Sequence, residues 1–308
     1  MQSPEFSVVI PLFNKREFIA QTLRSVLAQS RPAREIIVVD NGSTDGSDRI
    51  VTELAEPAIR LLREAQPGPA PARNCGIAVA TADWIAFIDA DDLWSADHLE
   101  RLAEVIDNHP AADLVATGFR RVESNAAIPE PAGPAGSRWL DFFGPGEANH
   151  ISTSSVAIRR ETLLAHGGFP NLPAGEDTDL WIRLAMRHRF AISAATTAAY
   201  VRANGGIMER EAAGIRDQAP PPSPVFAKIA ALLAAPEHAA RHQALADYGD
   251  ALRRLFAWQL AYHGHGAAAR SLLDGCQARP AGWWLAWLIS LVPGRLLRLA
   301  ARLRNRLT

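Results

Sequence analysis

Cysteine and lysine are scarce in this sequence. The two cysteines, Cys75 and Cys276, lie far apart, and Lys15 and Lys228 are the only lysines among 308 residues. Two distant cysteines form neither a disulfide framework nor a zinc-binding pattern, which favours a reducing compartment. Acidic and basic residues balance to a formal net charge of −1, so no global basic field points to nucleic acid as a partner.

Three further signals are missing. No GxGxxG follows the first apolar segment, which disfavours a dinucleotide-dependent oxidoreductase. The N-terminal residues lack a basic segment followed by a long apolar one, so we expect no secretory signal. The apolar run at residues 281–292 is shorter than the roughly 20 residues that span a bilayer. We therefore expect a cytoplasmic protein, with peripheral attachment to the inner face of the cytoplasmic membrane as an open alternative.

Short apolar runs alternate with helical patterns through the first half of the chain. Hydrophobic residues make up 48% of the sequence, enough for one large domain and an extension. The alternation predicts parallel βαβ units in an α/β sheet. Strands are expected at residues 6–10, 35–39, 59–62, 84–88, 112–119 and 151–158, and helices at residues 15–29, 47–56, 72–80, 96–108 and 177–188.

Three carboxylates, those of Asp89, Asp91 and Asp92, come at the end of the strand expected at residues 84–88. Acids this close repel one another unless a cation or hydrogen bonds offset their charge. Hard divalent ions such as Mg²⁺ or Mn²⁺ take oxygen ligands and share them with phosphates, and open α/β folds bind ligands at the carboxyl ends of their strands. The pattern predicts a metal-assisted site for a phosphorylated ligand. A turn with a helix N-cap is the alternative.

Side chains with binding chemistry also follow the other expected strands. Phe13 emerges after the first strand, where its ring packs either on a base or on the protein itself. Asp40 ends the second strand, where it accepts hydrogen bonds from a ribose or base, or closes the turn that caps the next helix. Arg73 opens a helix, where it holds a phosphate or base, or lies in solvent.

Five motifs occur in order along the chain: VVIPLFNK, VDNGSTDGS, GPAPARNCGI, FIDADDLW, and GGF followed by EDTDLWIRLA. Together they resemble glycosyltransferase family 2, a group of inverting enzymes that use nucleotide-sugar donors. The resemblance covers roughly residues 6–202. It implies an α/β fold of the Rossmann-like GT-A type, and leaves a helical C-terminal extension outside the family domain.

The resemblance also implies roles for the motif residues. Asp91 would bind Mn²⁺ or Mg²⁺, Asp89 would face the ribose, and Asp92 would face the donor sugar or the surroundings of the metal. A UDP-sugar is the donor that the resemblance implies. The family often has Asp in place of Asn41, and because an amide can donate as well as accept hydrogen bonds, a donor with another base stays open. The residues placed around the donor are Pro11, Phe13, Asp40, Asn41, Arg73, Asp89, Asp92 and Arg202.

Glu176 and Asp177 occupy the ED position of the family, at the start of an expected helix. A carboxylate there deprotonates the acceptor hydroxyl while the hydroxyl attacks the anomeric carbon from the face opposite the leaving group. The resemblance favours Asp177 as this base, with Glu176 orienting it or substituting for it. The alternative is that both acids only complement the helix dipole.

The C-terminal region is rich in Ala, Leu and Arg and reads as helical. In its tail, Trp283, Trp284 and Trp287 precede a basic amphipathic pattern, which suits adsorption to an anionic membrane surface. A helix packed on the protein or at a dimer interface is the alternative. The arginines of that pattern are Arg295, Arg298, Arg302 and Arg306. The expected parts are a GT-A domain at residues 1–204, a Pro-rich linker at 205–224, a helical extension at 225–280 and the tail at 281–308.

The sequence thus predicts a metal-dependent glycosyltransferase of the hexosyltransferase type. It would move a sugar from a nucleotide-sugar to a hydroxyl of a glycan or lipid-linked acceptor, with inversion, in the synthesis of cell-envelope polysaccharide or glycolipid. A catalytically silent sugar-nucleotide-binding or scaffold protein at the membrane surface is the alternative from another class. A nucleotidyltransferase is a third option, but it leaves the ED helix unexplained.

Overall fold

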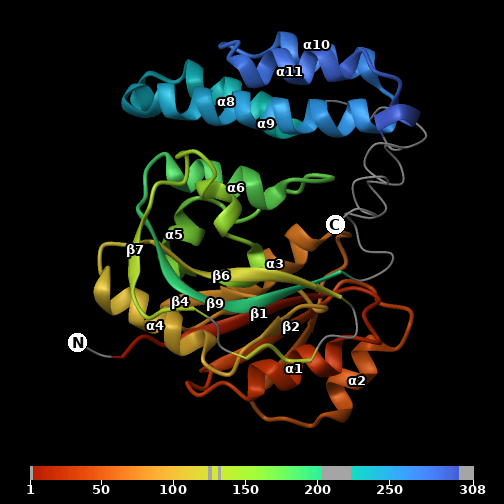
Figure 1. Cartoon of the computed structure of the whole chain (residues 1–308). Helices are drawn as coiled ribbons and strands as arrows, with labels where there is room; N and C mark the ends of the chain where they lie inside the picture. Colours follow the sequence, from red (N-terminus) through yellow and green to blue (C-terminus); the bar gives the residue numbers. More distant parts are fainter. Residues whose placement is uncertain (1–2, 124–126, 131–132, 203–222, 298–308) are drawn as a thin grey trace. The chain divides into compact units, whose positions relative to one another are not determined.

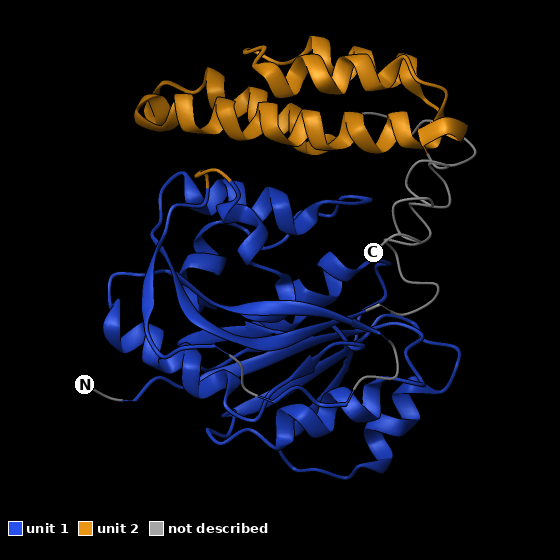
Figure 2. Cartoon of the chain, in the orientation of Figure 1, with its two compact units in different colours: residues 1–142, 146–203 blue, residues 143–145, 204–308 orange. Residues whose placement is uncertain are grey.

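The structure is a computed structural model, and it describes residues 3–123, 127–130, 133–202 and 223–297. The chain divides into two compact units (Figure 2). Unit 1 comprises residues 1–142 and 146–203, and unit 2 comprises residues 143–145 and 204–308. Each unit has a hydrophobic core of its own.

A nine-stranded sheet forms the centre of unit 1 (Figure 1). The strand order is β3-β2-β1-β4-β8-β6-β9-β5, and β7 pairs with β9. Strands β1 to β4 are mutually parallel, so their carboxyl ends meet at one edge of the sheet. The strands are β1 (Phe6–Leu12), β2 (Glu35–Asp40), β3 (Ile59–Arg63), β4 (Trp84–Phe87), β5 (Leu93–Trp94), β6 (Leu114–Glu123), β7 (Ser137–Leu140), β8 (Val156–Arg159) and β9 (Phe190–Arg202).

Helices cover both faces of this sheet, with α1 and α2 on one face and α3, α5 and α6 on the other (Figure 1). Val8 and Ile10 of β1 belong to the core cluster that α1 and α4 help to form. On the opposite face α3 approaches β1 so closely that a Cβ on Gly76 would lie 2.5 Å from Cγ1 of Val9, so only glycine fits there. The helices are α1 (Ile19–Leu27), α2 (Ser47–Glu53), α3 (Pro69–Val79), α4 (His98–Asn108), α5 (Arg160–Ala165) and α6 (Glu176–Ala185).

The expected parallel α/β arrangement of the first half is confirmed, but several boundaries differ. The helix expected from residue 15 begins only at Ile19, and before it the backbone N–H groups of Lys15 and Arg16 donate to Ser47 Oγ and Asp45 Oδ2. The strand expected at residues 151–158 is wrong in its first half. Residues Thr153–Ser155 form the 3₁₀ helix η2, and β8 begins only at Val156.

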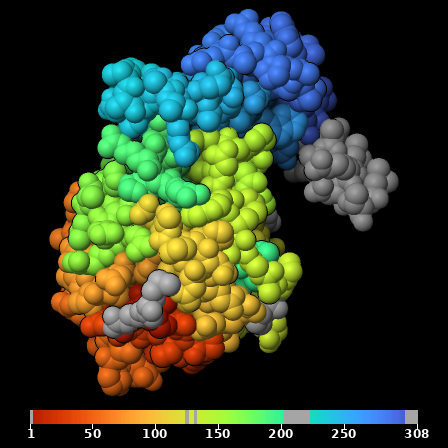
Figure 3. Space-filling model, turned by 90° about the vertical axis from the view of Figure 1, so that its left-hand side faces the viewer, coloured from red at the N-terminus to blue at the C-terminus, as the bar shows by residue number. Residues whose placement is uncertain are grey.

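Residues 223–297 of unit 2 are mostly helical, and the space-filling view draws them in cyan to blue (Figure 3). Most of the expected linker, residues 205–222, lies outside the described residues, and Pro224 at its end already begins α8. α11 belongs to the same core as α9 and α10, so the expected boundary at residue 281 separates residues that the structure packs together. The elements are α8 (Pro224–Ala234), η3 (Pro236–Arg241), α9 (His242–His263), α10 (Gly266–Asp274) and α11 (Ala281–Ser290). None of the described helices combines the length and apolar character needed to cross a membrane.

Candidate active site

The carboxyl ends of β1 and β2 carry the first group of predicted donor-binding residues. Pro11 lies inside β1, and Phe13 just beyond it is 47% exposed, as an aromatic ring must be to receive a base. Asp40 is only 3% exposed, and its carboxylate accepts a hydrogen bond from the backbone N–H of Ser43 at 3.1 Å. The turn-closing role expected as the alternative for Asp40 is therefore present in the structure.

Asn41 fastens a neighbouring loop. Its Nδ2 donates to the carbonyl oxygens of Glu64 and Gln66 at 3.0 and 2.7 Å, and its Oδ1 accepts from the backbone N–H of Gly68 at 2.7 Å. An aspartate would lack both donors, because an ionised carboxylate only accepts hydrogen bonds. The amide at this position is thus explained by the loop that precedes α3.

Asp89 and Asp91 of the loop after β4 each pair with a cation. The Nη2 of Arg73 lies 2.8 Å from Asp89 Oδ1, and the ammonium of Lys15 contacts the carboxylate of Asp91. Burial raises the pKa of Asp91, while Lys15 opposes that rise and Asp89 adds to it. The two cationic side chains therefore offset part of the repulsion between the acids.

Asp92 is buried beneath this loop, with 1% of its surface exposed. Its carboxylate accepts hydrogen bonds from Ser154 Oγ at 2.5 Å and from the backbone N–H of Val201 at 2.8 Å. Burial, followed by the charges of Asp89 and Asp91, raises its pKa well above the ordinary value. Asp92 therefore ties the acidic loop to η2 and β9.

Two residues of this site escaped the sequence analysis. The Oγ of Ser154 donates to Asp92 and accepts from the backbone N–H of Asp89 at 3.0 Å, so Ser154 fixes the loop from below. The phenol of Tyr200 lies near the acids, and burial together with the charges of Asp92, Asp89 and Asp91 raises its pKa to about 12. No local sequence signal marks Ser154, because its partners are 62 and 65 positions away.

Arg73 connects the two acidic centres of the site. Its side chain is 5% exposed, and its two terminal nitrogens lie 2.8 Å from Asp89 and 2.8 Å from Glu176. Burial alone lowers the pKa of Arg73, but the two carboxylates outweigh it and hold the pKa above its ordinary value. The guanidinium also lies 5.1 Å from the ring centre of Phe169. The solvated alternative for Arg73 is therefore wrong.

The neighbouring Asn74 holds the GGF segment beside Arg73. Its Nδ2 donates to the carbonyl oxygen of Phe169 at 2.7 Å, and its Oδ1 accepts from the backbone N–H of Phe169 at 2.9 Å. Gly168 has a φ of +63°, and a Cβ there would lie 2.3 Å from Asn74 Oδ1. Arg183 of α6 donates to the carbonyl oxygens of His166 and Gly168 from the other side. The third and fifth motifs thus form one packed unit.

Glu176 and Asp177 begin α6 and have different surroundings. Glu176 is engaged by Arg73, whereas Asp177 has no ion pair among the described residues. Asp177 Oδ1 accepts from the backbone N–H of Thr178 at 2.6 Å, and Oδ2 lies 3.5 Å from the hydroxyl of Thr153. Asp177 therefore differs from Glu176 in having no guanidinium partner among the described residues.

Arg202 ends β9, and its side chain lies outside the part of the structure that is described. Of the predicted residues, the structure joins Arg73, Asp89 and Glu176 by direct contacts. It gives Asp40, Asn41 and Asp92 protein partners at the same edge. Their proposed contacts with donor, metal or acceptor stay predictions.

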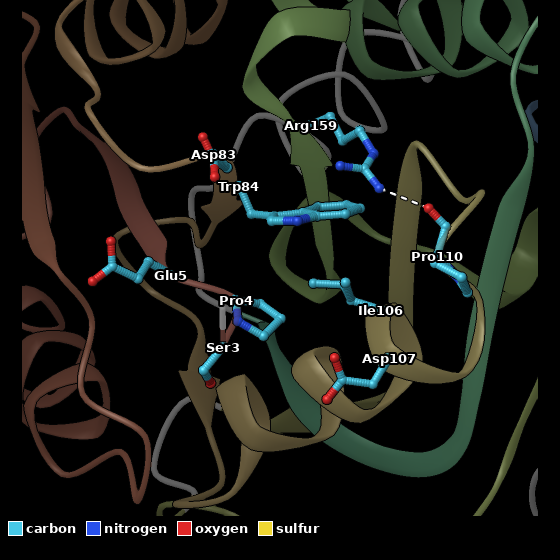
Figure 4. A pocket seen from close by; sticks show the side chains of 9 residues that line it. All are labelled: Ser3, Pro4, Glu5, Asp83, Trp84, Ile106, Asp107, Pro110 and Arg159. Carbon is cyan, nitrogen blue, oxygen red and sulfur yellow. Dashed lines mark hydrogen bonds between the residues drawn. The ribbon is translucent and has the colours of Figure 1, made fainter. Parts of the chain in front are cut away.

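The described residues of unit 1 line hollows at two places considered for the reaction. One of about 230 Å³ has Trp84 and Arg159 in its wall, with the guanidinium over the indole (Figure 4). It lies where β1 and β4 begin, the edge opposite the acids, so we do not assign it to the reaction. The second, of about 420 Å³, is lined by Phe119 and Arg121 of β6 and by Ala148, Asn149 and Ile151.

The sequence pattern described as "Glycosyl transferase family 2" matches residues 7–164, just over half of the chain. An uncharacterized glycosyltransferase of Nostoc sp. is 40% identical over 104 residues, which cover 33% of this chain and 32% of that protein. The succinoglycan biosynthesis protein ExoO of Rhizobium meliloti is 35% identical over 105 residues, which cover 34% and 30%. The chain thus spans about a third of the length of these two curated relatives.

A solved structure shares the fold. The crystal structure of residues 1–349 of S. aureus TarS in complex with UDP-GlcNAc superposes with a TM-score of 0.66 at 20% sequence identity. The match covers 88% of this chain and 81% of that one. This likeness confirms the expected fold class, an α/β domain of the GT-A type with a helical C-terminal region.

Proposed function

This chain belongs to glycosyl transferase family 2, and we propose that unit 1 transfers a sugar from a nucleotide-sugar donor to an acceptor hydroxyl with inversion at the anomeric carbon. One observation carries the proposal. Arg73 bridges Asp89 of the acidic loop and Glu176 at the start of α6, so the donor-side and acceptor-side carboxylates belong to one site. A single displacement needs both groups at once, one beside the leaving group and one beside the nucleophile.

Asp177 is the proposed general base. Its Oδ1 is held by the first turn of α6, while Oδ2 has only the long contact to Thr153, so an acceptor hydroxyl can displace that contact. The carboxylate takes the hydroxyl proton as the oxygen bonds to the anomeric carbon and the bond from that carbon to the diphosphate breaks. Glu176 orients the site through Arg73 and keeps its own charge compensated.

A divalent cation, Mn²⁺ or Mg²⁺, is the proposed cofactor. In the described residues no group of three or more His, Cys, Asp or Glu side chains could hold a metal by itself. The donor set nevertheless fits Mg²⁺ chemistry, in which one or two carboxylates share the ion with substrate phosphates and water. Asp91 is the available carboxylate, because its partner Lys15 is a flexible side chain. When bound, the ion would offset negative charge on the departing diphosphate.

The donor is proposed to be a UDP-sugar. The bound UDP-GlcNAc of the TarS structure supports a nucleotide-sugar, although at 20% identity it identifies neither the base nor the sugar. The exposed ring of Phe13 offers a surface for the base, and the buried Asp40 holds the neighbouring turn in place. The succinoglycan protein of Rhizobium supports an acceptor in cell-envelope polysaccharide or glycolipid synthesis.

The acceptor is proposed to occupy the hollow beside Phe119 and Arg121. Ile151 in its wall lies two positions before Thr153, whose hydroxyl contacts Asp177. An acceptor seated there would thus lie on the same segment that reaches the base. Replacing Arg121 with Ala is expected to raise the KM for the acceptor while the KM for the donor stays unchanged.

Donor turnover with Mn²⁺ tests this function. Asp177→Asn is expected to lower kcat by about 10²–10⁴-fold. The same variant should still bind the donor, which thermal-shift measurements with a panel of nucleotide-sugars can detect. Asp48→Asn is the matched control, because Asp48 is also an acid in the first turn of a helix but lies at α2 and pairs with Arg63. Asp91→Ala is expected to lose the response to Mn²⁺.

Three results would overturn parts of the proposal. Retention of the anomeric configuration in the product, determined by NMR, would exclude the single displacement. Full activity in both Asp177→Asn and Asp91→Ala would remove the assigned site. Donor binding without transfer or hydrolysis for every nucleotide-sugar tested would instead indicate a catalytically silent binding protein.

A further inference from the structure

α11 is apolar on the side that faces its own unit and also on the side that faces away. The inner side packs into the core of unit 2, where Trp283 is buried and its Nε1 donates to the carbonyl oxygen of Leu273 at 2.8 Å. Residues 281–292 read AGWWLAWLISLV, and their only polar side chain, that of Ser290, is buried as well. The helix therefore has no polar face to present to water.

Large exposed apolar side chains occur on the outward side and just beyond the helix, and we call this set the apolar face. Each member is between 50% and 60% exposed: Trp284, Leu285 and Leu288 of α11, Leu291 at its C-cap, and Leu296 beyond Pro293. A surface helix of a water-soluble domain normally carries charged and polar residues on this side. Exposed apolar surface of this extent marks a site of interaction with a partner or a membrane.

Close packing fixes the apolar face in this orientation. A Cβ on Gly266 of α10 would lie 2.1 Å from the carbonyl oxygen of Ser290, so the two helices touch through their backbones. Arg270 of α10 donates to the same carbonyl oxygen at 3.1 Å. Turning α11 to bury Leu285 and Leu288 would expose Trp283 and break these contacts. The outward side is thus a consequence of the fold.

The charge of the surrounding sequence identifies the kind of partner. Residues 275–308 contain six arginines and no acidic residue or lysine. Arg279 lies 4.7 Å from the ring centre of Trp283, and Arg295 is exposed between Leu291 and Leu296 of the apolar face. Exposed apolar side chains with arginines before and after them in the sequence match the boundary between lipid headgroups and acyl chains in an anionic leaflet.

We propose that the apolar face of α11 inserts into the interface of an anionic phospholipid bilayer and holds the protein at the membrane surface. Leu285 and Leu288 enter the acyl boundary, Trp284 lies at headgroup level, and Arg279 and Arg295 contact the phosphates. The proposal goes beyond glycosyl transfer and does not depend on it. Attachment to the membrane would place the protein where the local concentration of a lipid-linked acceptor is high.

Sedimentation of the full chain with vesicles tests the proposal. The protein is expected to bind vesicles of phosphatidylglycerol and phosphatidylethanolamine, and to bind phosphatidylcholine vesicles at least fivefold more weakly. Leu285→Asp with Leu288→Asp is expected to weaken binding to the anionic vesicles at least tenfold. Leu164→Asp is the matched control, because Leu164 of unit 1 is 49% exposed and lies outside the apolar face.

A charge variant, circular dichroism and donor turnover distinguish loss of membrane binding from loss of folding. Arg295→Glu is expected to weaken binding in low salt and to lose much of its effect in high salt. Circular dichroism and donor turnover of all variants should match the parent, since none of these residues lies in the catalytic site. Binding that is unaffected by the Leu285→Asp, Leu288→Asp pair overturns the proposal. So does a parent oligomer that the same pair converts to monomer while no vesicle is bound, which would assign the apolar face to a second copy of the chain.

Discussion

Arg73 and Glu176 lie 103 positions apart in the sequence, yet Nη1 of Arg73 is 2.8 Å from Oε1 of Glu176 in a nearly solvent-free setting. The second terminal nitrogen of the same guanidinium contacts Asp89. The guanidinium of Arg73 therefore pairs with one carboxylate of the acidic loop and one at the start of α6. Glu176 and Asp89 depend on Arg73 for compensation of their charge.

Removing Arg73 is expected to destabilise unit 1. Arg73→Met leaves two partly buried carboxylates without a cation, and the free energy of unfolding should fall by about 3–5 kcal/mol. Urea unfolding followed by fluorescence measures this change. Glu176→Gln should cost less in the Arg73→Met background than in the parent, because the partner is already gone. Arg31→Met is the control, since its pair with Glu100 is more exposed and should be worth about 0–1 kcal/mol.

Lys15 is expected to compete with a metal ion for Asp91. The ammonium already occupies the carboxylate that would ligate Mn²⁺, so Lys15→Ala should tighten Mn²⁺ binding in the absence of donor. We expect a change of about two- to fivefold, the size that a partly exposed ion pair of about 0.4–1 kcal/mol allows. Titration of Mn²⁺ followed by electron paramagnetic resonance gives the dissociation constant without any turnover. Lys228→Ala, which removes the other lysine, should leave it unchanged, and equal binding in all three proteins would contradict the competition.

Asn41→Asp tests whether the amide serves the protein or the donor. The change replaces two donated hydrogen bonds to Glu64 and Gln66 with repulsion between carboxylate and carbonyl oxygens, at a cost of about 1–3 kcal/mol. Asn14→Asp is the matched control, because Asn14 Oδ1 accepts from the backbone N–H of Thr44 and a carboxylate can do the same. A lower melting temperature for Asn41→Asp alone is the expected result. Unchanged stability of Asn41→Asp together with a change in the preferred nucleotide base would show that the amide serves donor recognition rather than the loop.

His98 is expected to make unit 1 sensitive to acid. Its ring stacks on Trp94, its Nδ1 lies 2.7 Å from Thr197 Oγ1, and burial lowers its pKa to about 3. In the unfolded chain the pKa of His98 is near the ordinary 6.5, so between these two pKa values the unfolded state binds a proton that the folded state does not. The free energy of unfolding that depends on neutral His98 is therefore fully present above about pH 6.5. It falls by up to about 1.4 kcal/mol per pH unit as the pH drops towards 3.

Unfolding free energies measured across this pH range check the effect. His98→Leu should flatten the slope, whatever its effect on stability at neutral pH. Thr197→Val is the control, since it removes the hydrogen bond but keeps the buried imidazole, and it should retain the slope. A slope that is equal in the parent and in His98→Leu would assign the acid sensitivity to other groups.

Much of the fold followed from the periodicity of apolar residues. Runs such as Val8–Ile10 and Ile36–Val39 are buried on both sides, as strands inside a parallel sheet must be. Boundaries were less predictable where side chains compete for backbone groups. The backbone N–H of Lys15, before Ile19, bonds to Ser47 Oγ, which lies 32 positions away in the sequence. Ser152 and Ser155 instead form a local capping box, which begins η2 where a strand was expected.

The sequence by itself determined where the chemistry lies. Asp40 ends β2 and the acids Asp89 to Asp92 follow β4, and because parallel strands end at one edge, these carboxylates had to gather there. Only the tertiary structure decided how each is used. Arg73 pairs with two carboxylates, Asn41 bonds to the loop before α3, and Asp92 is buried against Ser154. Each of these roles depends on partners from distant segments and on exclusion of water. Those contacts arise from packing in three dimensions, which residue types and spacing do not specify.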